Sequence, residues 1–532
     1  MSEKLLTLPI GIQSFERLRG QGCLYVDKTE RLMALTATAG RCFLSRPRRF
    51  GKSLTISTLD AMFSGKAELF EGLAAEAWVK DQAQHPAPVL RLDMSMLETD
   101  SIPRLEQSLS EMLERRTEDH GIKLKSQTLG GKFQDLISGL FKAQGPVVVL
   151  IDEYDKPILD NMGELERADA MRQVLRSFYT VLKGCDEYLR FVMLTGISKF
   201  TKTGIFSAMN NLNDISMDKQ YGDIVGYTQA ELEEDFSGWL ENAAAGMKLE
   251  RGELLKQMKD YYDGFCFDGQ TRLYNPFSIL NFLSRQEFKN YWYTSGSPSF
   301  IVSYMKRHKI QDPAEYRHRE VLEDFAEAQE IERAAPESFL YQGGYLTIKE
   351  KRERQLILDY PNQEVRDSIS SMYLDQVYHV KEYVTLGGKL WEALSAGDVG
   401  GAVQLYNTAL SGVPYDDFPH RDESWYRSLF LMLLRGAGIS VHGEVHGSRG
   451  RTDVLVGFPS RVVVLEFKLA KDAGEVEARR VEGQKQMEEK GYARPYESGP
   501  RELTTAVIVI DGTERQAVSA CASRRSAPMS RF

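Results

Sequence analysis

The sequence predicts an α/β protein: a helix-covered parallel sheet, a helical middle region, and a small mixed α/β domain near the C-terminus. Three observations predict this arrangement. Short apolar runs alternate with longer helical patterns up to about residue 240, which is typical of a parallel sheet covered by helices. Helical patterns and aromatic turns then dominate to about residue 380. Strand patterns return after residue 450, beyond a further helical segment.

The expected strands are short and strongly apolar. In the first half they are Cys42–Leu44, Val89–Leu92, Val147–Ile151 and Phe191–Leu194, and near the C-terminus they are Asp453–Val456, Val462–Phe467 and Ala506–Ile510. A chain of 532 residues is longer than a single hydrophobic core usually organises, so we expect several domains. The expected divisions are 1–240, a helical lid or spacer at 241–380, a second α/β domain at 381–515, and a loosely ordered tail at 516–532, rich in Ser, Arg and Ala.

Composition excludes several classes of protein. Hydrophobic residues make up 42% and charged residues 27% of the chain, as in an ordinary globular protein. No apolar run approaches the ~20 residues that a membrane span needs, and the N-terminus lacks a secretory signal. Five scattered cysteines without CxxC spacing favour reduced thiols in a cytoplasm. A net charge of −9 argues against a protein that coats nucleic acid nonspecifically. It is still compatible with a local basic groove that binds phosphates.

A phosphate-binding loop is predicted where Gly51-Lys52-Ser53 joins a short strand to an apolar-periodic helix. Backbone N–H groups would hold the phosphates, Lys52 would reach the β and γ oxygens, and the Ser53 hydroxyl would ligate Mg²⁺. The standard pattern has glycine where this chain has Arg46, and an exposed basic turn is the alternative interpretation. The candidate ATP-binding residues in the loop are Arg46, Pro47, Arg48, Arg49, Phe50, Gly51, Lys52, Ser53 and Leu54.

Two adjacent carboxylates follow the buried strand at 147–151. Because parallel sheets place their ligands at the carboxyl ends of strands, Asp152 would hold Mg²⁺ and Glu153 would polarise the attacking water. A strand that ends in a solvated acidic pair is the alternative. The next strand ends in polar residues, of which Ser198 could sense the γ-phosphate.

Three strings give the chain a resemblance to a known family: YVDKT at 25–29, RPRRFGKSL at 46–54 and IDEYDKP at 151–157. They resemble the AAA-ATPase-like family of bacteria and archaea, in which a P-loop NTPase domain precedes a PD-(D/E)XK nuclease-superfamily domain. The RPRRFGKS form of the loop looks usual for that family, and the likeness covers nearly the whole chain. It implies a prokaryotic, cytoplasmic protein that uses ATP.

The C-terminal strands fit a nuclease site of this superfamily. Glu466 and Lys468 are two residues apart, so they project from one face of a strand, and a hairpin would bring Asp453 beside them. Two carboxylates would hold Mg²⁺ or Mn²⁺, while the lysine would position the hydrolytic water. The helices on either side offer Glu423 as a further acid and Gln486 as the glutamine of the superfamily pattern.

The sequence therefore predicts an ATP-binding and ATP-hydrolysing protein whose nucleotide state regulates a Mg²⁺-dependent nuclease-like domain. Nucleic acid is the expected partner, with DNA favoured over RNA; no membrane partner is expected, and self-association is left open. The alternative is an ATP-dependent switch whose C-terminal domain binds nucleic acid or a protein without cutting. The sequence leaves open whether the nuclease site is active.

Overall fold

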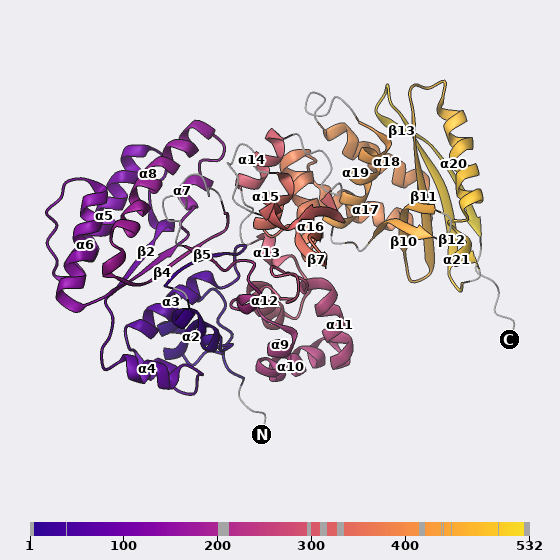
Figure 1. Ribbon diagram of the computed structural model, residues 1–532. Helices are drawn as coiled ribbons and strands as arrows, with labels where there is room; N and C mark the ends of the chain where they lie inside the picture. The colour runs from indigo at the N-terminus through magenta and orange to yellow at the C-terminus, as the bar shows by residue number, and fades with distance from the viewer. Residues whose placement is uncertain are drawn as a thin grey trace. The chain divides into compact units, whose positions relative to one another are not determined.

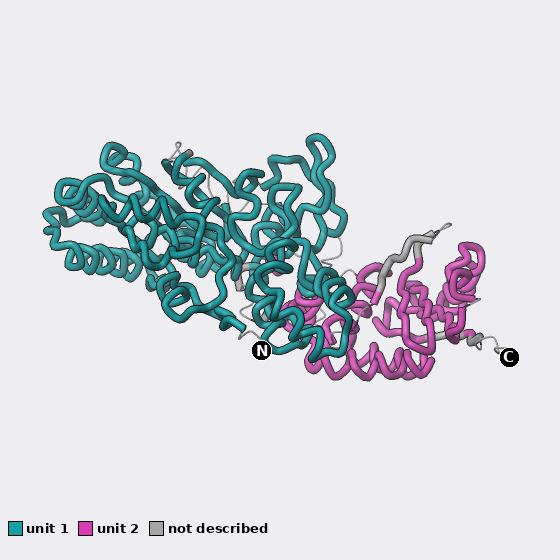
Figure 2. The backbone as a smooth tube through the Cα atoms, turned by 90° about the horizontal axis from the view of Figure 1, so that it is seen from below, with its two compact units in different colours: residues 1–304, 316–365 teal, residues 305–315, 366–532 magenta. Residues whose placement is uncertain are grey.

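The chain folds into two compact units. The computed structural model describes residues 5–38, 40–199, 212–294, 299–308, 316–326, 335–413, 421–437, 439, 441–447, 450–497 and 499–525. Unit 1 comprises residues 1–304 and 316–365, and unit 2 comprises residues 305–315 and 366–532 (Figure 2). Most of the expected spacer therefore belongs to unit 1, and the main division falls near residue 365, not near 380.

Unit 1 contains the predicted parallel sheet. Its strands are β1 (Arg41–Ser45), β2 (Val89–Asp93), β3 (Val147–Asp152), β4 (Leu189–Gly196) and β5 (Asn213–Asp214). They pair in parallel in the order β2-β3-β4-β1-β5, so β4 lies between the strand before the glycine-lysine loop and the strand that ends in the acids. Every residue of β3 is buried, as expected for the interior of a sheet covered on both faces.

Helices cover this sheet. Their bounds are α1 Phe15–Gly20, α2 Thr29–Thr38, α3 Lys52–Phe63, α4 Glu76–Gln82, α5 Ile102–His120, α6 Leu129–Gln144, α7 Lys156–Leu159 and α8 Leu165–Gly184. Figure 1 shows α5, α6 and α8 gathered on one side of the sheet, with α2, α3 and α4 on the other. The buried residues of α5 are Leu105, Leu109, Leu113 and Thr117, a four-residue spacing that gives the helix one apolar stripe.

The middle region is helical but also holds a small sheet. Its helices are α9 Gln229–Asp235, α10 Ser237–Met247, α11 Arg251–Tyr262, α12 Pro276–Arg285, α13 Tyr291–Thr294, α14 Ser299–Arg307, α15 Pro336–Gln342 and α16 Gln363–Met372. Three antiparallel strands, β6 (Arg319–Leu322), β7 (Thr347–Arg352) and β8 (Gln355–Asp359), were not anticipated. The charged sequence KEKRERQ runs through the β7–β8 hairpin, so it shows no apolar alternation that would predict a strand.

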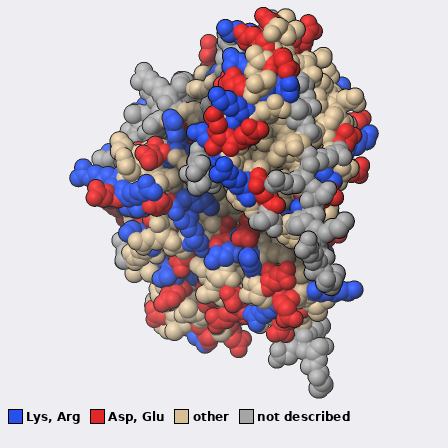
Figure 3. Space-filling model, turned by 90° about the vertical axis from the view of Figure 1, so that its right-hand side faces the viewer, with Lys and Arg blue, Asp and Glu red and all other residues tan. Residues whose placement is uncertain are grey.

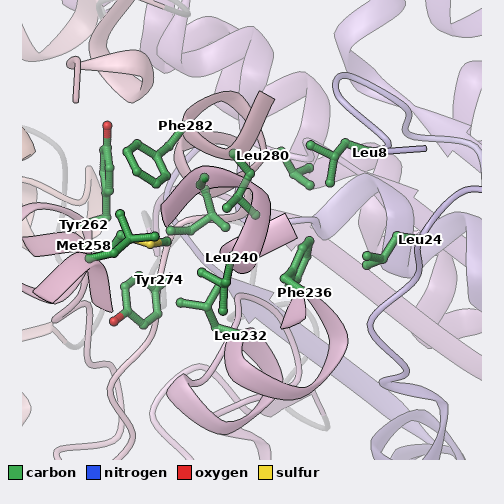
Figure 4. Packing of buried hydrophobic residues seen from close by; sticks show 14 of the residues in the cluster. Leu8, Leu24, Leu232, Phe236, Leu240, Met258, Tyr262, Tyr274, Leu280 and Phe282 are labelled. Atoms are coloured by element: carbon green, nitrogen blue, oxygen red, sulfur yellow. The ribbon is translucent and has the colours of Figure 1, made fainter. Parts of the chain in front are cut away.

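One core joins the N-terminal segment to the middle helices. Leu8 and Leu24 pack with buried residues of α9 to α12, as Figure 4 shows. The labelled side chains from those helices and the turn before α12 are Leu232, Phe236, Leu240, Met258, Tyr262, Tyr274, Leu280 and Phe282. The N-terminal segment and the middle helices therefore fold together, which explains why the middle region belongs to unit 1.

Unit 2 is a three-layer α/β domain. Its helices are α17 Tyr383–Ser395, α18 Val399–Gly412, α19 Glu423–Gly436, α20 Val476–Lys490 and α21 Arg494–Glu497. Its strands are β9 His442–Gly447, β10 Gly450–Gly457, β11 Arg461–Ala470, β12 Glu502–Asp511 and β13 Gln516–Arg525. They pair in the order β13-β12-β11-β10-β9; β11 and β12 are parallel and the other pairs antiparallel, which gives the expected mixed sheet.

Each face of the unit 2 sheet carries its own helices. Phe467 of β11 contacts Tyr406 of α18 and Phe430 of α19 on one face. On the other face, Val476 and Met487 of α20 pack on the cluster formed by Ala470, Val507 and Val509. The expectation of a loose tail from residue 516 is wrong for 516–525, which form β13; small residues such as Ala517 and Ala520 pair with β12 without giving a strong apolar signal.

Two further findings concern the whole described chain. No helix in its described ranges combines the length and apolar character needed to cross a membrane. The four cysteines whose side chains are described, Cys23, Cys42, Cys185 and Cys266, are buried and free of disulfides. Burial raises the pKa of Cys185 and Cys266 to about 11, so both remain neutral thiols at ordinary pH.

Candidate nucleotide site and candidate nuclease site

The glycine-lysine loop has the geometry of a phosphate-binding loop. Gly51 has a φ of 98°, which favours glycine, and α3 begins at the next residue with its N–H groups facing the loop. The Lys52 ammonium donates to the carbonyls of Arg46 (2.9 Å) and Pro47 (3.0 Å). Burial lowers the pKa of Lys52, and the nearby carboxylates of Glu153 and Asp152 oppose that shift.

A cavity of about 430 Å³ lies against this loop. Lys52, Ser53 and Glu153 line it, together with residues of the N-terminal segment and the middle helices. The lining residues outside the loop and the acid strand are Pro9, Gly11, Ile12, Gln13, Leu18, Lys156, Tyr227, Pro276, Phe277 and Leu280. Leu280 also belongs to the core that contains Leu8, so that core positions both walls. A lining that combines charged side chains with apolar ones is typical of a pocket for a small polar ligand such as a nucleotide.

The two acids differ in position. Asp152 is buried and accepts a hydrogen bond of 2.5 Å from the Thr195 hydroxyl at the end of β4. Glu153 lines the cavity with a φ of 51°, a left-handed conformation that is uncommon for a residue other than glycine and that recurs at functional sites. Burial raises the pKa of Glu153, although Lys52 opposes the shift. Thr195 was not among the predicted site residues; its place at the end of a neighbouring strand is the signal that could have identified it.

Other predicted loop residues lie outside the cavity. The Arg46 side chain is buried, donates to the carbonyl of Ser216 (2.6 Å), and lies over the Phe267 ring at 4.4 Å. Pro47 and Phe50 do not line the cavity, whereas Arg48, Arg49, Ser53 and Leu54 do. The backbone N–H and hydroxyl of Ser198 both donate to Asp155, which ties that residue into the sheet edge.

Residues of the middle region hold the loop from outside. The carbonyl of Arg48 accepts hydrogen bonds from the Trp292 indole (3.2 Å) and the Asn275 amide (3.5 Å). The backbone N–H of Trp292 and the hydroxyl of Ser278 donate in turn to Glu364, a fully buried carboxyl on α16. Glu364 thereby connects α16 to α12, which lines the cavity.

The Glu364 carboxyl makes stability depend on pH. Burial raises its pKa to about 8, although hydrogen bonds from Trp292 and Ser278 oppose the shift. The unfolded chain releases this proton near the ordinary pKa of 4.5, so the free energy of unfolding falls as pH rises from about 4.5 to about 8. We expect Glu364→Gln, which mimics the neutral acid, to match wild type near pH 5 and to exceed it by a few kcal/mol, roughly, at pH 8.5.

Urea unfolding of unit 1 between pH 5 and pH 9 measures this effect. Glu106→Gln, on the exposed side of α5, is the matched control and should leave the pH profile unchanged. A Glu364→Gln profile parallel to that of wild type over the whole range would contradict a neutral carboxyl.

In unit 2 the predicted hairpin brings Asp453 to the E-x-K strand. The β10–β11 ladder ends at the Val454–Leu465 pair, and beyond it the Phe467 N–H donates to Asp453 Oδ2 (2.9 Å). Arg427 of α19 donates to the other oxygen, Oδ1, at 2.8 Å. Asp453 is therefore fixed from two directions. Arg427 was not predicted, although it lies four residues after Glu423 and thus on the same face of its helix.

Glu466, Lys468 and Glu423 form the rest of the cluster. The Lys468 ammonium contacts Glu466 Oε1 at 3.0 Å and Glu423 Oε1 at 3.4 Å. The other Glu423 oxygen accepts the N–H of Leu469. Burial and the neighbouring Asp453 raise the pKa of Glu466 to about 7. Burial would lower the pKa of Lys468, but Glu466 and Glu423 outweigh it and raise that pKa.

The donor set fits a hard divalent cation. Glu466 is 1% exposed, and its Oε2 has no hydrogen-bond partner among the residues that the structure describes. An unsatisfied buried carboxylate oxygen beside a second carboxylate is what a Mg²⁺ or Mn²⁺ site offers, since Mg²⁺ binds one or two carboxylates and keeps several waters. The described ranges hold no group of three or more His, Cys, Asp or Glu side chains placed to bind one metal ion.

Gln486 lies elsewhere on α20. Its amide donates to the Tyr492 hydroxyl at 3.3 Å, and Tyr492 packs with Val462 and Val464 nearer the start of β11. Gly483 of α20 lies beside the site, since an added Cβ there would lie 3.2 Å from Lys468 Cγ. The described contacts therefore bring Asp453, Glu466, Lys468 and Glu423 together and leave Gln486 apart.

These features define the class of protein: a P-loop ATPase domain followed by a PD-(D/E)XK-type domain. Residues 9–206 match the family described as predicted AAA-ATPase, and residues 421–520 match the PD-(D/E)XK nuclease superfamily. A protein of Azotobacter chroococcum mcd 1, described as "Uncharacterized protein in vnfD 5'region", is 34% identical over 502 residues, 92% of this chain and 93% of that one. The chain belongs to this family of AAA-ATPase-like proteins with a C-terminal PD-(D/E)XK domain.

Two solved structures of Aeropyrum pernix are distant matches. The ORC1 protein, in complex with DNA, is 9% identical, with 64% of this chain and 92% of that chain covered and a TM-score of 0.24. The ORC2 protein, with ADPNP and ADP, is 12% identical, with coverages of 83% and 89% and a TM-score of 0.27. Scores this low add nothing to the assignment, which depends on the strand order, the loop and the E-x-K cluster.

Proposed function

We propose that the protein binds and hydrolyses ATP, and that its nucleotide state controls Mg²⁺-dependent phosphodiester cleavage by unit 2. The observation that carries the proposal is a buried Asp453–Glu466–Lys468 cluster in which Glu466 Oε2 has no hydrogen-bond partner within the described ranges, on a chain that also has a loop-lined cavity. Nucleic acid is the substrate class, with DNA preferred. We place the protein in a prokaryotic cytoplasm, and buried thiols such as Cys23, Cys185 and Cys266 fit a reducing compartment.

In the nucleotide cavity each residue has a distinct task. Lys52 gives up its two carbonyl partners and pairs with phosphate oxygens, while the α3 N–H groups hold the same anion. Glu153, which lies in the cavity, accepts a proton from the attacking water. Asp152 and Ser53 are the residues that would hold Mg²⁺, and Thr195 orients Asp152. A bound Mg²⁺ would neutralise charge that develops on the phosphates.

In the nuclease site Asp453 and Glu466 would hold the cation, which would polarise a phosphodiester oxygen when bound. The Lys468 ammonium lies within reach of Glu466 and Glu423. It can therefore orient a water molecule and offset the negative charge of the pentacoordinate phosphorane transition state. Glu423 fixes that ammonium from the side of α19.

Surface charge favours local recognition of the substrate over broad electrostatic capture. Lys and Arg side chains alternate with Asp and Glu on the face that Figure 3 presents. On α20, Arg479 pairs with Glu482, and Arg480 pairs with Glu477. A nucleic acid would therefore contact few unpaired cations on that helix, and binding should depend on the site itself. The non-cutting switch remains the second candidate; the paired Arg427 and Asp453 favour it, because they occupy an oxygen that a cation would need.

Nucleotide control is tested with a protein that binds ATP but does not hydrolyse it. In Glu153→Gln we expect ATP addition to change the Mg²⁺-dependent cleavage rate of DNA and RNA probes by several-fold, because ATP can shift only an equilibrium whose two states it binds differently. Lys52→Ala should not respond to ATP. Equal cleavage rates with and without ATP, in protein shown to bind both ligands, would leave two independent modules. Absence of cleavage with intact binding would favour the switch.

A further inference from the structure

Arg427 occupies an unusual position for a cation. Its side chain is 10% exposed, and its Nη1 lies 2.8 Å from Asp453 Oδ1, while Nη2 lies 3.3 Å from the Ser424 hydroxyl. Asp453 is equally buried, with 9% of its side chain exposed. A charge-assisted hydrogen bond between two buried groups is strong, and removing one partner destabilises the fold because it leaves the other charge buried and unpaired.

The charges around the E-x-K strand fall into two groups. Lys468 lies between Glu466 and Glu423, and Arg427 pairs with Asp453. Each carboxylate keeps an oxygen away from its cation: Glu466 Oε2 has no partner in the described chain, and Asp453 Oδ2 accepts a backbone N–H. Arg427 thus supplies a positive charge directly beside Asp453.

We propose that Arg427 is a positioning residue that competes with the divalent cation for Asp453 and so keeps the metal affinity of the nuclease site low. This inference depends on the proposed function, because it takes Asp453 and Glu466 as the cation's ligands. A guanidinium beside Asp453 repels a divalent cation at the same carboxylate, and the two cannot share Oδ1 without loss to one of them. Metal binding at Oδ1 then requires Arg427 to leave that oxygen, so Arg427 of α19 opposes metal loading.

The experiment measures Mn²⁺ binding by calorimetry on the full chain without nucleotide. Arg427→Met removes the charge and keeps much of the bulk, and Arg427→Gln also keeps a hydrogen-bond donor. We expect both to bind Mn²⁺ at least about tenfold more tightly than wild type. Arg427→Lys, which keeps the charge, should stay close to wild type. In thermal unfolding, the metal-free Met variant should melt below wild type, and Mn²⁺ should raise its melting temperature by more.

The outcomes separate the inference from the proposed function. Unchanged or weaker Mn²⁺ binding in folded Arg427→Met and Arg427→Gln would overturn the competition. If the Arg427 variants show no tighter binding but Asp453→Asn abolishes the Mn²⁺ binding seen in wild type, the metal site is supported and only the competition is refuted. If neither wild type nor either charge-removing variant binds Mn²⁺ at Asp453, both the inference and the metal-dependent function fail.

Discussion

Lys52→Ala is expected to reduce ATP affinity by about 100-fold or more, and so to abolish binding at ordinary concentrations. Lys52 is buried and lines the cavity, and its ammonium donates to two carbonyls of the loop whose N–H groups would surround the phosphates. Each charge-assisted hydrogen bond to a buried phosphate contributes about 1.5–3 kcal/mol, and a tenfold change in affinity corresponds to about 1.4 kcal/mol. Calorimetric titration with ATP measures the loss.

The control for this variant is Lys142→Ala, which removes an exposed lysine from α6 and should bind ATP as wild type does. Removing Lys52 leaves the carbonyls of Arg46 and Pro47 without their ammonium partner, so the melting temperature must be recorded to show that the fold survives. A folded Lys52→Ala protein with wild-type ATP affinity would refute the phosphate-binding loop.

The second large effect is expected at the nuclease site. Lys468→Ala should lower phosphodiester cleavage by about 100-fold or more and leave ATP hydrolysis intact, because a preorganised cation beside the reacting phosphate acts mainly in the transition state. Lys468 lies between Glu466 and Glu423 with both contacts formed. The rate is measured under saturating Mg²⁺ with single- and double-stranded probes.

Lys471→Ala is the matched control, since Lys471 is an exposed lysine three residues further along. Its cleavage rate should equal that of wild type. Wild-type cleavage by folded Lys468→Ala would place the reaction elsewhere. Loss of both cleavage and ATP hydrolysis would indicate damage to the whole chain and not to one site.

The sequence predicted the sites through short patterns that depend on local geometry. Gly51-Lys52-Ser53 follows one strand of the parallel sheet, and Asp152 ends another. Because parallel strands end at the same edge of a sheet, the sequence predicts that the two motifs lie near each other. The site in unit 2 could also be predicted from local geometry. Glu466 and Lys468 share one face of a strand, and a hairpin brings the strand of Asp453 beside it. The strand order, with β4 between the two motifs, confirms the fold class but could not be read from spacing alone.

What escaped the sequence were contacts between residues far apart in the chain. Trp292 and Asn275 hold the Arg48 carbonyl across more than two hundred residues, and no local pattern marks such a pair. Arg46 was predicted to bind ATP together with its neighbours in the loop, yet its side chain turns into the core to meet Phe267. The position of a residue in the loop predicted the path of its backbone but not the direction of its side chain.

Helix α16 has a consequence for how such proteins can be reshuffled during evolution. The division between the units falls inside this helix, after Val365, with Glu364 bonded on one side of it. Domains usually recombine through loops, where an extra residue is harmless. Here a single inserted residue would turn the later residues of α16 by about 100° relative to its earlier residues and so break up the buried face of the helix. Exchange of the C-terminal unit between relatives must therefore preserve the helical register, which favours inheritance of the two units as one piece.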